Sequence, residues 1–92
     1  MNKKLPLICP SCDSLLKVKQ LHCVNCETDV TGLYSLPIIS QLSIDDQRFI
    51  LDFVKASGSL KVMAQNMKLS YPTVRNRLDD IINGINNLET ND

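Results

Sequence analysis

Hydrophobic and polar residues alternate with a period of two in the first third of the chain. Between residues 15 and 22, Leu16 and Val18 fall on one face while Lys17 and Lys19 fall on the other, as in a β-strand. Residues 29–36 predict a further strand, in which Gly32 marks a bend or bulge. Pro37 then closes a small β unit, which we place at residues 1–37.

The pattern changes to a helical one after a short apolar connector at residues 38–42. Ser43 predicts a helix start, and Asp46 lies three residues later in the position of a capping-box acid. Gly58 is expected to be the C′ residue that ends this first helix. The apolar stripe of the helix is predicted to be Ile50, Phe53 and Val54.

Two more helices are predicted in quick succession. Ser59 caps a helix that runs to about residue 67 and buries Leu60, Met63, Ala64 and Met67. Ser70 caps a third helix, with Pro72 in its first turn. Its apolar stripe continues through Val74, Leu78, Ile81, Ile85 and Leu88. Gly84 argues against a long third helix, because glycine costs about 1 kcal/mol relative to alanine, and the Asn-Gly pair favours an end there.

A helix, a short turn and a helix on a third supporting helix is the helix-turn-helix arrangement. In that arrangement the second helix lies in the major groove of DNA, with its N-terminal residues touching the bases. The predicted fold is therefore small α+β, with a short antiparallel β unit followed by an all-α helix-turn-helix domain at residues 43–92.

The four cysteines carry the strongest chemical signal. Cys9, Cys12, Cys23 and Cys26 form two C-x2-C turns separated by ten residues, the spacing of a zinc ribbon. Four thiolates fill the coordination shell, so one structural Zn²⁺ is expected. Iron bound by the same four cysteines remains the alternative. The alternative, a disulfide framework, requires an oxidising compartment that no targeting segment indicates. With four thiolates available, His22 is expected to be a half-exposed strand residue.

Zinc knuckles commonly have glycine after the second cysteine, where the chain turns left-handed. This chain has Asp13 and Glu27 there. Asp tolerates the left-handed conformation better than Glu, so the second knuckle is expected to turn differently from the first.

Charge supports a nucleic-acid partner only locally. The chain has 10 Lys and Arg against 10 Asp and Glu, so its net charge argues for no such partner. Yet residues 55–78 contain five bases and no acid, while acids lie on both sides of this segment. Asp79 and Asp80 confine an anion to the N-terminal half of the third helix. Double-stranded DNA is thus the expected partner, with the candidate contacts Lys61, Lys68, Ser70, Tyr71, Thr73, Arg75, Asn76 and Arg77.

Other functional classes find little support. The longest apolar runs are too short to cross a membrane, and Pro6 and Pro10 interrupt the only run that resembles a signal peptide. We therefore expect a mature, cytoplasmic N-terminus. No nucleophile–base set, phosphate loop or open metal site indicates an enzyme.

The motifs "CPSC", "LHCVNC" and "SYPTVRNRLDDII" resemble, in order and spacing, small bacterial zinc-ribbon plus helix-turn-helix proteins that are catalogued as a domain of unknown function. The third helix is also similar to that of sigma-factor region four. The resemblance covers about residues 7–82. It implies a bacterial, cytoplasmic, DNA-binding transcription regulator in which Cys9, Cys12, Cys23 and Cys26 bind zinc.

Two alternatives remain open at this point. The chain could be an adaptor that binds RNA polymerase or a sigma factor, which its neutral charge and flanking acids favour. Oxidation of the zinc thiolates could make it a redox sensor. Separately, a homodimer is expected, because a single helix-turn-helix usually needs a second half-site. Its seam is predicted at Ile81, Ile85 and Leu88.

Overall fold

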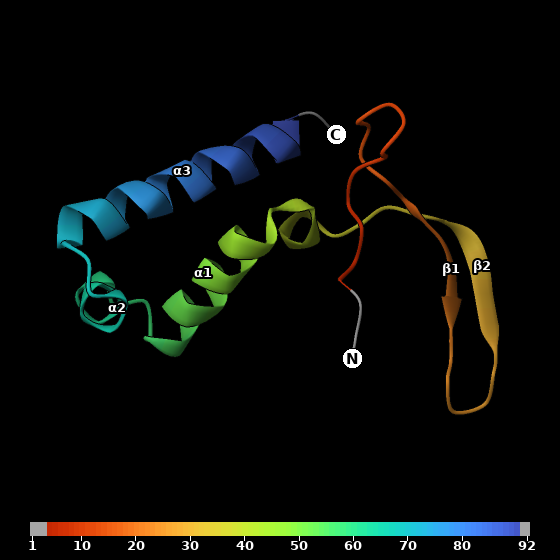
Figure 1. The fold of residues 1–92 in the computed structure, drawn as a ribbon, viewed down its shortest axis with the longest axis horizontal. Coiled ribbons are helices and arrows are strands. Elements are labelled where there is room, and N and C mark those ends of the chain that lie inside the picture. Colours follow the sequence, from red (N-terminus) through yellow and green to blue (C-terminus); the bar gives the residue numbers. More distant parts are fainter. Residues whose placement is uncertain (1–3, 91–92) are drawn as a thin grey trace. The chain divides into compact units, whose positions relative to one another are not determined.

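The computed structural model describes residues 4–90, which belong to two compact units, Met1–Pro37 and Ile38–Asp92. Residues 1–3, the start of the expected cytoplasmic N-terminus, lie outside the described residues, as does the acid Asp92. A two-stranded antiparallel sheet with four cysteines is followed by three α-helices, so the fold is small α+β, as predicted (Figure 1).

The sheet pairs β1 (Val18–His22) with β2 (Asp29–Tyr34). The register moves from Val18↔Tyr34 to Gln20↔Thr31, so β2 has one extra residue and forms a bulge. Gly32 lies in this bulge, where the sequence placed it. A Cβ at Gly32 would come within 2.7 Å of Cζ in the Tyr34 ring, so this ring covers the position where a side chain would stand.

A short 3-10 turn, η1 (Ile38–Gln41), opens the second unit ahead of α1 (Ile44–Lys55). The expected connector thus belongs to this unit, and Leu42 is buried in its core. Gln47 of α1 holds the connector, because its Nε2 donates to the Leu42 carbonyl at 2.9 Å. Ser43 caps α1 as predicted and accepts a hydrogen bond from the Asp46 amide at 3.1 Å.

The buried face of α1 differs from the predicted stripe. Phe49 is the buried residue, with 3% of its surface exposed, and Ile50 and Phe53 pack against the core. Val54 was predicted to be buried but is 68% exposed. The helix has apolar residues around more of its circumference than one face can bury, so periodicity alone chose the wrong edge of the stripe.

The end of α1 also differs by one residue from the prediction. Ser57, at φ 57°, is the C′ residue, and Gly58, at φ 77°, follows it. The Gly58 amide donates to the Phe53 carbonyl and the Ser57 amide to the Val54 carbonyl, each at 2.9 Å. These two bonds form a Schellman motif. Here two left-handed residues follow each other, and only the second is a glycine.

The helices α2 (Leu60–Met67) and α3 (Tyr71–Thr90) complete the unit. Ser59 caps α2 as predicted, and Lys68 ends it in the left-handed conformation. Contrary to the expectation for Gly84, α3 continues through that position to Thr90. Ile85 and Leu88 pack against the core after it, and such burial outweighs the roughly 1 kcal/mol cost of one helical glycine.

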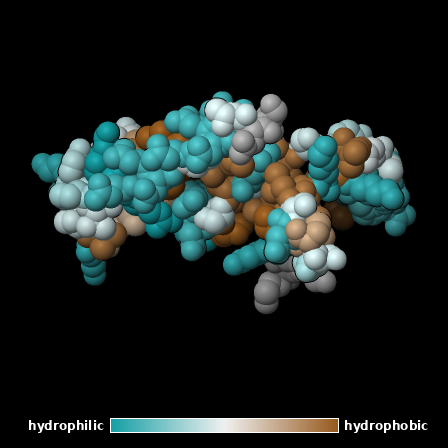
Figure 2. Space-filling model, turned by 90° about the horizontal axis from the view of Figure 1, so that it is seen from above, coloured by the Kyte–Doolittle hydropathy of each residue, from teal (hydrophilic) through white to brown (hydrophobic). Residues whose placement is uncertain are grey.

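One hydrophobic core holds the three helices together. Leu78, Ile85 and Leu88 of α3 lie against it, partly buried, while the surface over α3 is largely hydrophilic when seen from above in Figure 2. The outer face of α3 is therefore polar and accessible. The buried residues of the core are Leu42, Phe49, Leu60, Met63, Ala64, Val74 and Ile81.

Candidate metal and nucleic-acid sites

The two C-x2-C turns fold in the same way. The Asp13 amide donates to the Cys9 carbonyl at 2.9 Å, and the Glu27 amide donates to the Cys23 carbonyl at 2.7 Å. Asp13 and Glu27 are both left-handed, at φ 60° and φ 63°. The expectation that the second knuckle turns differently is therefore wrong. The closing hydrogen bonds hold Glu27 in this conformation despite its steric cost.

A hydroxyl side chain accompanies each knuckle, which the sequence analysis missed. Cys12 Sγ lies 3.3 Å from Ser14 Oγ, and Cys26 Sγ lies 3.0 Å from Thr28 Oγ1. These side-chain hydrogen bonds, with help from the backbone of Ser14 and Thr28, lower the pKa of Cys12 and of Cys26. The thiolates that a metal requires are thus easier to form. A hydroxyl residue two positions after each second cysteine was the available signal.

The structure brings the cysteines together as two pairs. One turn follows the bridge residue Ile8, which pairs with Leu15, and the other connects β1 to β2. Within residues 4–90, no group of three or more potential ligands is placed to hold a metal ion, and none of the four cysteines forms a disulfide. Two matching knuckles with four soft sulfur donors fit zinc chemically. Their convergence on one ion stays a prediction.

His22 lies at the base of the second knuckle, opposite Asp29 in the sheet register. Its Nδ1 is 2.6 Å from Asp29 Oδ1, and both side chains are about half exposed. His22 is therefore the half-exposed strand residue that the sequence predicted, here held by a carboxylate.

Seven of the eight candidate DNA contacts are exposed on α2, the turn and the start of α3. Ser70 and Thr73 also have a structural role: Ser70 Oγ accepts from the Thr73 amide at 3.3 Å and lies 2.7 Å from Thr73 Oγ1. These two hydroxyls fix the first turn of α3. The seven exposed residues are Lys61, Lys68, Ser70, Tyr71, Thr73, Arg75 and Asn76.

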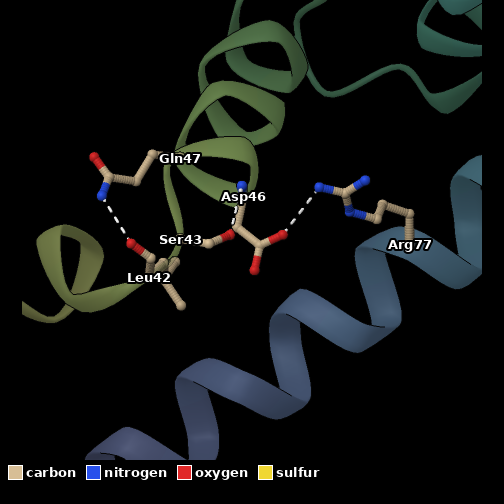
Figure 3. A network of polar contacts seen from close by, with 5 residues as sticks. All are labelled: Leu42, Ser43, Asp46, Gln47 and Arg77. Atoms are coloured by element: carbon tan, nitrogen blue, oxygen red, sulfur yellow. Dashed lines mark hydrogen bonds and ion pairs between the residues drawn. The ribbon is translucent and has the colours of Figure 1, made fainter. Parts of the chain in front are cut away.

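Arg77, the eighth candidate, points toward α1 (Figure 3). Its Nη2 donates to Asp46 Oδ1 at 3.0 Å, and its guanidinium carbon lies 5.6 Å from the centre of the Phe49 ring. These contacts orient Arg77 toward α1, and its role as a DNA contact stays a prediction. Residue 77 lies three positions after the buried Val74, so its long side chain reaches α1, with 40% of its surface still exposed. Asp46 was assigned to a capping box, but its carboxylate pairs across the helices.

Arg75 is also paired, but weakly and at the surface. Its Nε lies 3.5 Å from Asp79 Oδ1 one turn along α3, and both side chains are about half exposed. Exposed pairs at this spacing contribute only about 0.3–0.5 kcal/mol. A phosphate or a base edge can therefore displace Asp79 from the Arg75 guanidinium with little loss of free energy.

The residues predicted to form a dimer seam on α3 pack within their own chain, and the homodimer itself stays a prediction. Ile81 is only 3% exposed, and Ile85 and Leu88 pack against the core of the same chain. The regular stripe along α3 is used for packing within the monomer, because η1 and α2 both contact this helix. Periodicity alone cannot distinguish a monomer core from a two-stranded seam.

These features define a class, proteins with an N-terminal zinc ribbon followed by a helix-turn-helix. Residues 42–87 match the family model described as a domain of unknown function (DUF2089)-HTH, and residues 9–40 match the one described as DUF2089 zinc ribbon. The chain therefore belongs to the DUF2089 family, which confirms the resemblance found in the sequence. Domains of these two types are typical of binding proteins rather than enzymes.

Among curated proteins, the H-N-H endonuclease F-TflI of Escherichia phage T5 is 30% identical over 63 residues. The match covers 68% of this chain and 32% of that protein, so the chain spans about a third of the length of this relative. No solved structure matches the chain significantly. Across the described residues, the structure has no helix that is both long and apolar enough to span a membrane.

Proposed function

We propose that the chain is a transcription regulator that binds double-stranded DNA, with the first half of α3 in the major groove. The observation that carries this proposal is the absence of acids from residues 55–78, which run from the end of α1 through α2 and the turn to the start of α3. With Arg77 held by Asp46, four bases of this segment remain exposed: Lys55, Lys61, Lys68 and Arg75. A phosphate backbone is attracted by such a local concentration of positive charge.

The side chains divide into two roles by type and position. Lys61 and Lys68 are flexible point charges on α2 and the turn, suited to phosphates. Arg75 and Asn76 are exposed on α3 and carry the donor groups that recognise guanine and adenine edges. Tyr71, also exposed, stands at the first position of α3 beside the capping Ser70 and Thr73.

Acids limit how the DNA approaches. Asp79 and Asp80 follow one turn after Arg75 and Asn76, and an acid at this point repels a phosphate backbone. The duplex must therefore meet α3 at its N-terminal end. In this proposal one Zn²⁺ bound by the four cysteines stabilises the ribbon. The protein acts in the bacterial cytoplasm, where thiols stay reduced.

Fluorescence anisotropy with random-sequence duplex DNA tests the proposal at several salt concentrations. If Lys61 and Lys68 each neutralise one phosphate, the logarithm of affinity falls against the logarithm of salt with a slope of about −1.8. Each alanine substitution at these residues should reduce the slope by about 0.9. The control Lys17→Ala removes one exposed charge from the ribbon strand region and should leave the slope unchanged. Absence of duplex binding at low salt overturns the proposal.

A second candidate function is an adaptor for a protein of the transcription machinery. The observation that favours it is apolar exposure on the ribbon unit, where Val24 at the second knuckle is 91% exposed and Leu33 is 74% exposed. Purified RNA polymerase and sigma factor, free of nucleic acid, are the direct probes. Binding that Val24→Glu abolishes, together with no duplex binding, would favour the adaptor over the regulator.

A further inference from the structure

The outward face of α1 carries apolar side chains that the helical unit does not cover. Leu51 is 61% exposed, Ile44 is 39% exposed, and Val54 is 68% exposed on the side away from the buried Phe49. Residues 44, 51 and 54 are seven and three positions apart, so they lie along one side of the helix. Ile44 and Leu51 line a shallow hollow along this helix together with Gln47, Arg48, Asp52 and Lys55.

Charged residues beside this apolar line alternate in sign. Asp45, Arg48, Asp52 and Lys55 are all exposed and follow each other as acid, base, acid and base. The outer pair, Asp45 and Lys55, lies five positions on either side of residue 50. The inner pair, Arg48 and Asp52, lies two positions on either side of the same residue. Reversing the helix direction therefore exchanges every acid with a base.

This symmetry matches what a two-fold interface needs. In a two-fold dimer the same patch meets itself, so each residue that contacts a second one is contacted by it in return. Two α1 helices packed antiparallel would place Asp45 opposite Lys55 of the partner subunit and Arg48 opposite Asp52 of the partner subunit. Leu51, one position from residue 50, would then lie near the two-fold axis and meet Leu51 of the partner subunit.

We propose that this face of α1 is the docking surface for a second copy of the same chain, packed antiparallel about a two-fold axis near residue 50. The α3 stripe is used within the monomer, so α1 takes the role expected of the seam at Ile81, Ile85 and Leu88. Twelve residues of helix span about 18 Å. Such a short contact is below the size of stable interfaces, so the dimer is weak.

Sedimentation equilibrium of the full chain tests this directly, from about 1 µM to about 1 mM, where weak complexes form. The mass should rise from 10.3 kDa toward twice that value as concentration increases. Leu51→Glu should weaken association by about 100-fold or more, because two buried leucines are lost from each dimer. The matched control is Ile82→Glu on the outer face of α3, at 42% exposure, which should leave association unchanged.

Charge-reversal variants at positions 48 and 52 distinguish the two-fold pairing from non-specific association. Arg48→Asp alone, or Asp52→Arg alone, places like charges opposite each other twice in every dimer and should weaken association at least about fivefold. The double variant Arg48→Asp, Asp52→Arg restores opposite charges and should recover it. Both side chains are exposed, and they also border a hollow lined by Phe49, Met67 and Arg77 of the same chain, so circular dichroism must show an unchanged fold in all three variants.

Three outcomes overturn the proposal. The first is a wild-type mass that stays at 10.3 kDa over the whole range. The second is dissociation by Ile82→Glu but not by Leu51→Glu, which would place the interface on α3. The third is a constant mass with amide shifts in the ribbon on Leu51→Glu, which would show that the ribbon of the same chain covers this face. Because mass is measured without DNA, a failure here leaves the proposed function unaffected.

Discussion

Replacing Arg77 with alanine should destabilise the helical unit without acting directly on DNA recognition. Arg77 joins α3 to α1 through Asp46 at 3.0 Å and through the Phe49 ring at 5.6 Å (Figure 3). Phe49 is itself part of the hydrophobic core. Removing the guanidinium therefore withdraws two contacts that connect helices distant in sequence.

The size of the effect follows from the exposure of the partners. The Arg77 and Asp46 side chains are 40% and 30% exposed, so their ion pair is worth about 0.5–1 kcal/mol rather than the value of a buried pair. The cation–π contact with Phe49 adds about 0.5–1 kcal/mol. The variant should thus lose about 1.5 kcal/mol of unfolding free energy. For a unit of this size, that loss lowers the Tm by roughly 6–12 °C.

Thermal and urea unfolding, followed by far-UV circular dichroism, measure this loss. A double-mutant cycle with Asp46→Ala should give a coupling energy of about 0.5–1 kcal/mol for the pair. The matched control is Arg75→Ala, which should cost less than about 0.5 kcal/mol because its pair with Asp79 is exposed. The reasoning is refuted if Arg77→Ala leaves stability unchanged while it weakens DNA binding as much as Arg75→Ala.

Three further predictions concern the rest of the fold. Gly84→Ala should raise the unfolding free energy by about 1 kcal/mol in urea denaturation, because a Cβ there meets no atom within 4 Å; a loss of stability would show that the α3 backbone needs glycine. A strong chelator should release one Zn²⁺ per chain and unfold the ribbon, while the helical dichroism of the separate second unit persists; simultaneous loss of both signals contradicts this. The double variant Ser14→Ala, Thr28→Val should raise the pKa of Cys12 and Cys26, so that protons compete better with the metal. In a pH titration, the midpoint of zinc release should therefore move upward. An unmoved midpoint would show that these hydroxyls have no influence on metal binding.

Local sequence signals predicted most of the fold because local interactions decide those features. Ser43, Ser59 and Ser70 are each followed by a helix whose third amide donates to the serine hydroxyl. Gly32 lies in the bulge because the Tyr34 ring occupies the space of a side chain. The family resemblance likewise came from three short motifs, "CPSC", "LHCVNC" and "SYPTVRNRLDDII". None of these features depends on a residue far away in the chain.

The errors arose where a distant partner decides the outcome. Arg77 was predicted to face solvent because no local sequence signal indicates its ion pair with Asp46, which lies 31 positions earlier. The same holds for Val54 and for the α3 stripe, since periodicity gives the apolar side of a helix but not what covers it. Gly84 was misjudged because the packing of Ile85 and Leu88 outweighs local propensity.

The central claim is that DNA meets α2 and the first half of α3, and a nuclear magnetic resonance titration tests it most directly. Zinc-loaded, ¹⁵N-labelled protein would be mixed with duplex DNA at low salt, and the shift of every backbone amide followed. We predict that the largest shifts lie between Lys61 and Asn76, with small shifts in the second half of α3. Shifts confined to the ribbon, or none at all, would contradict the account.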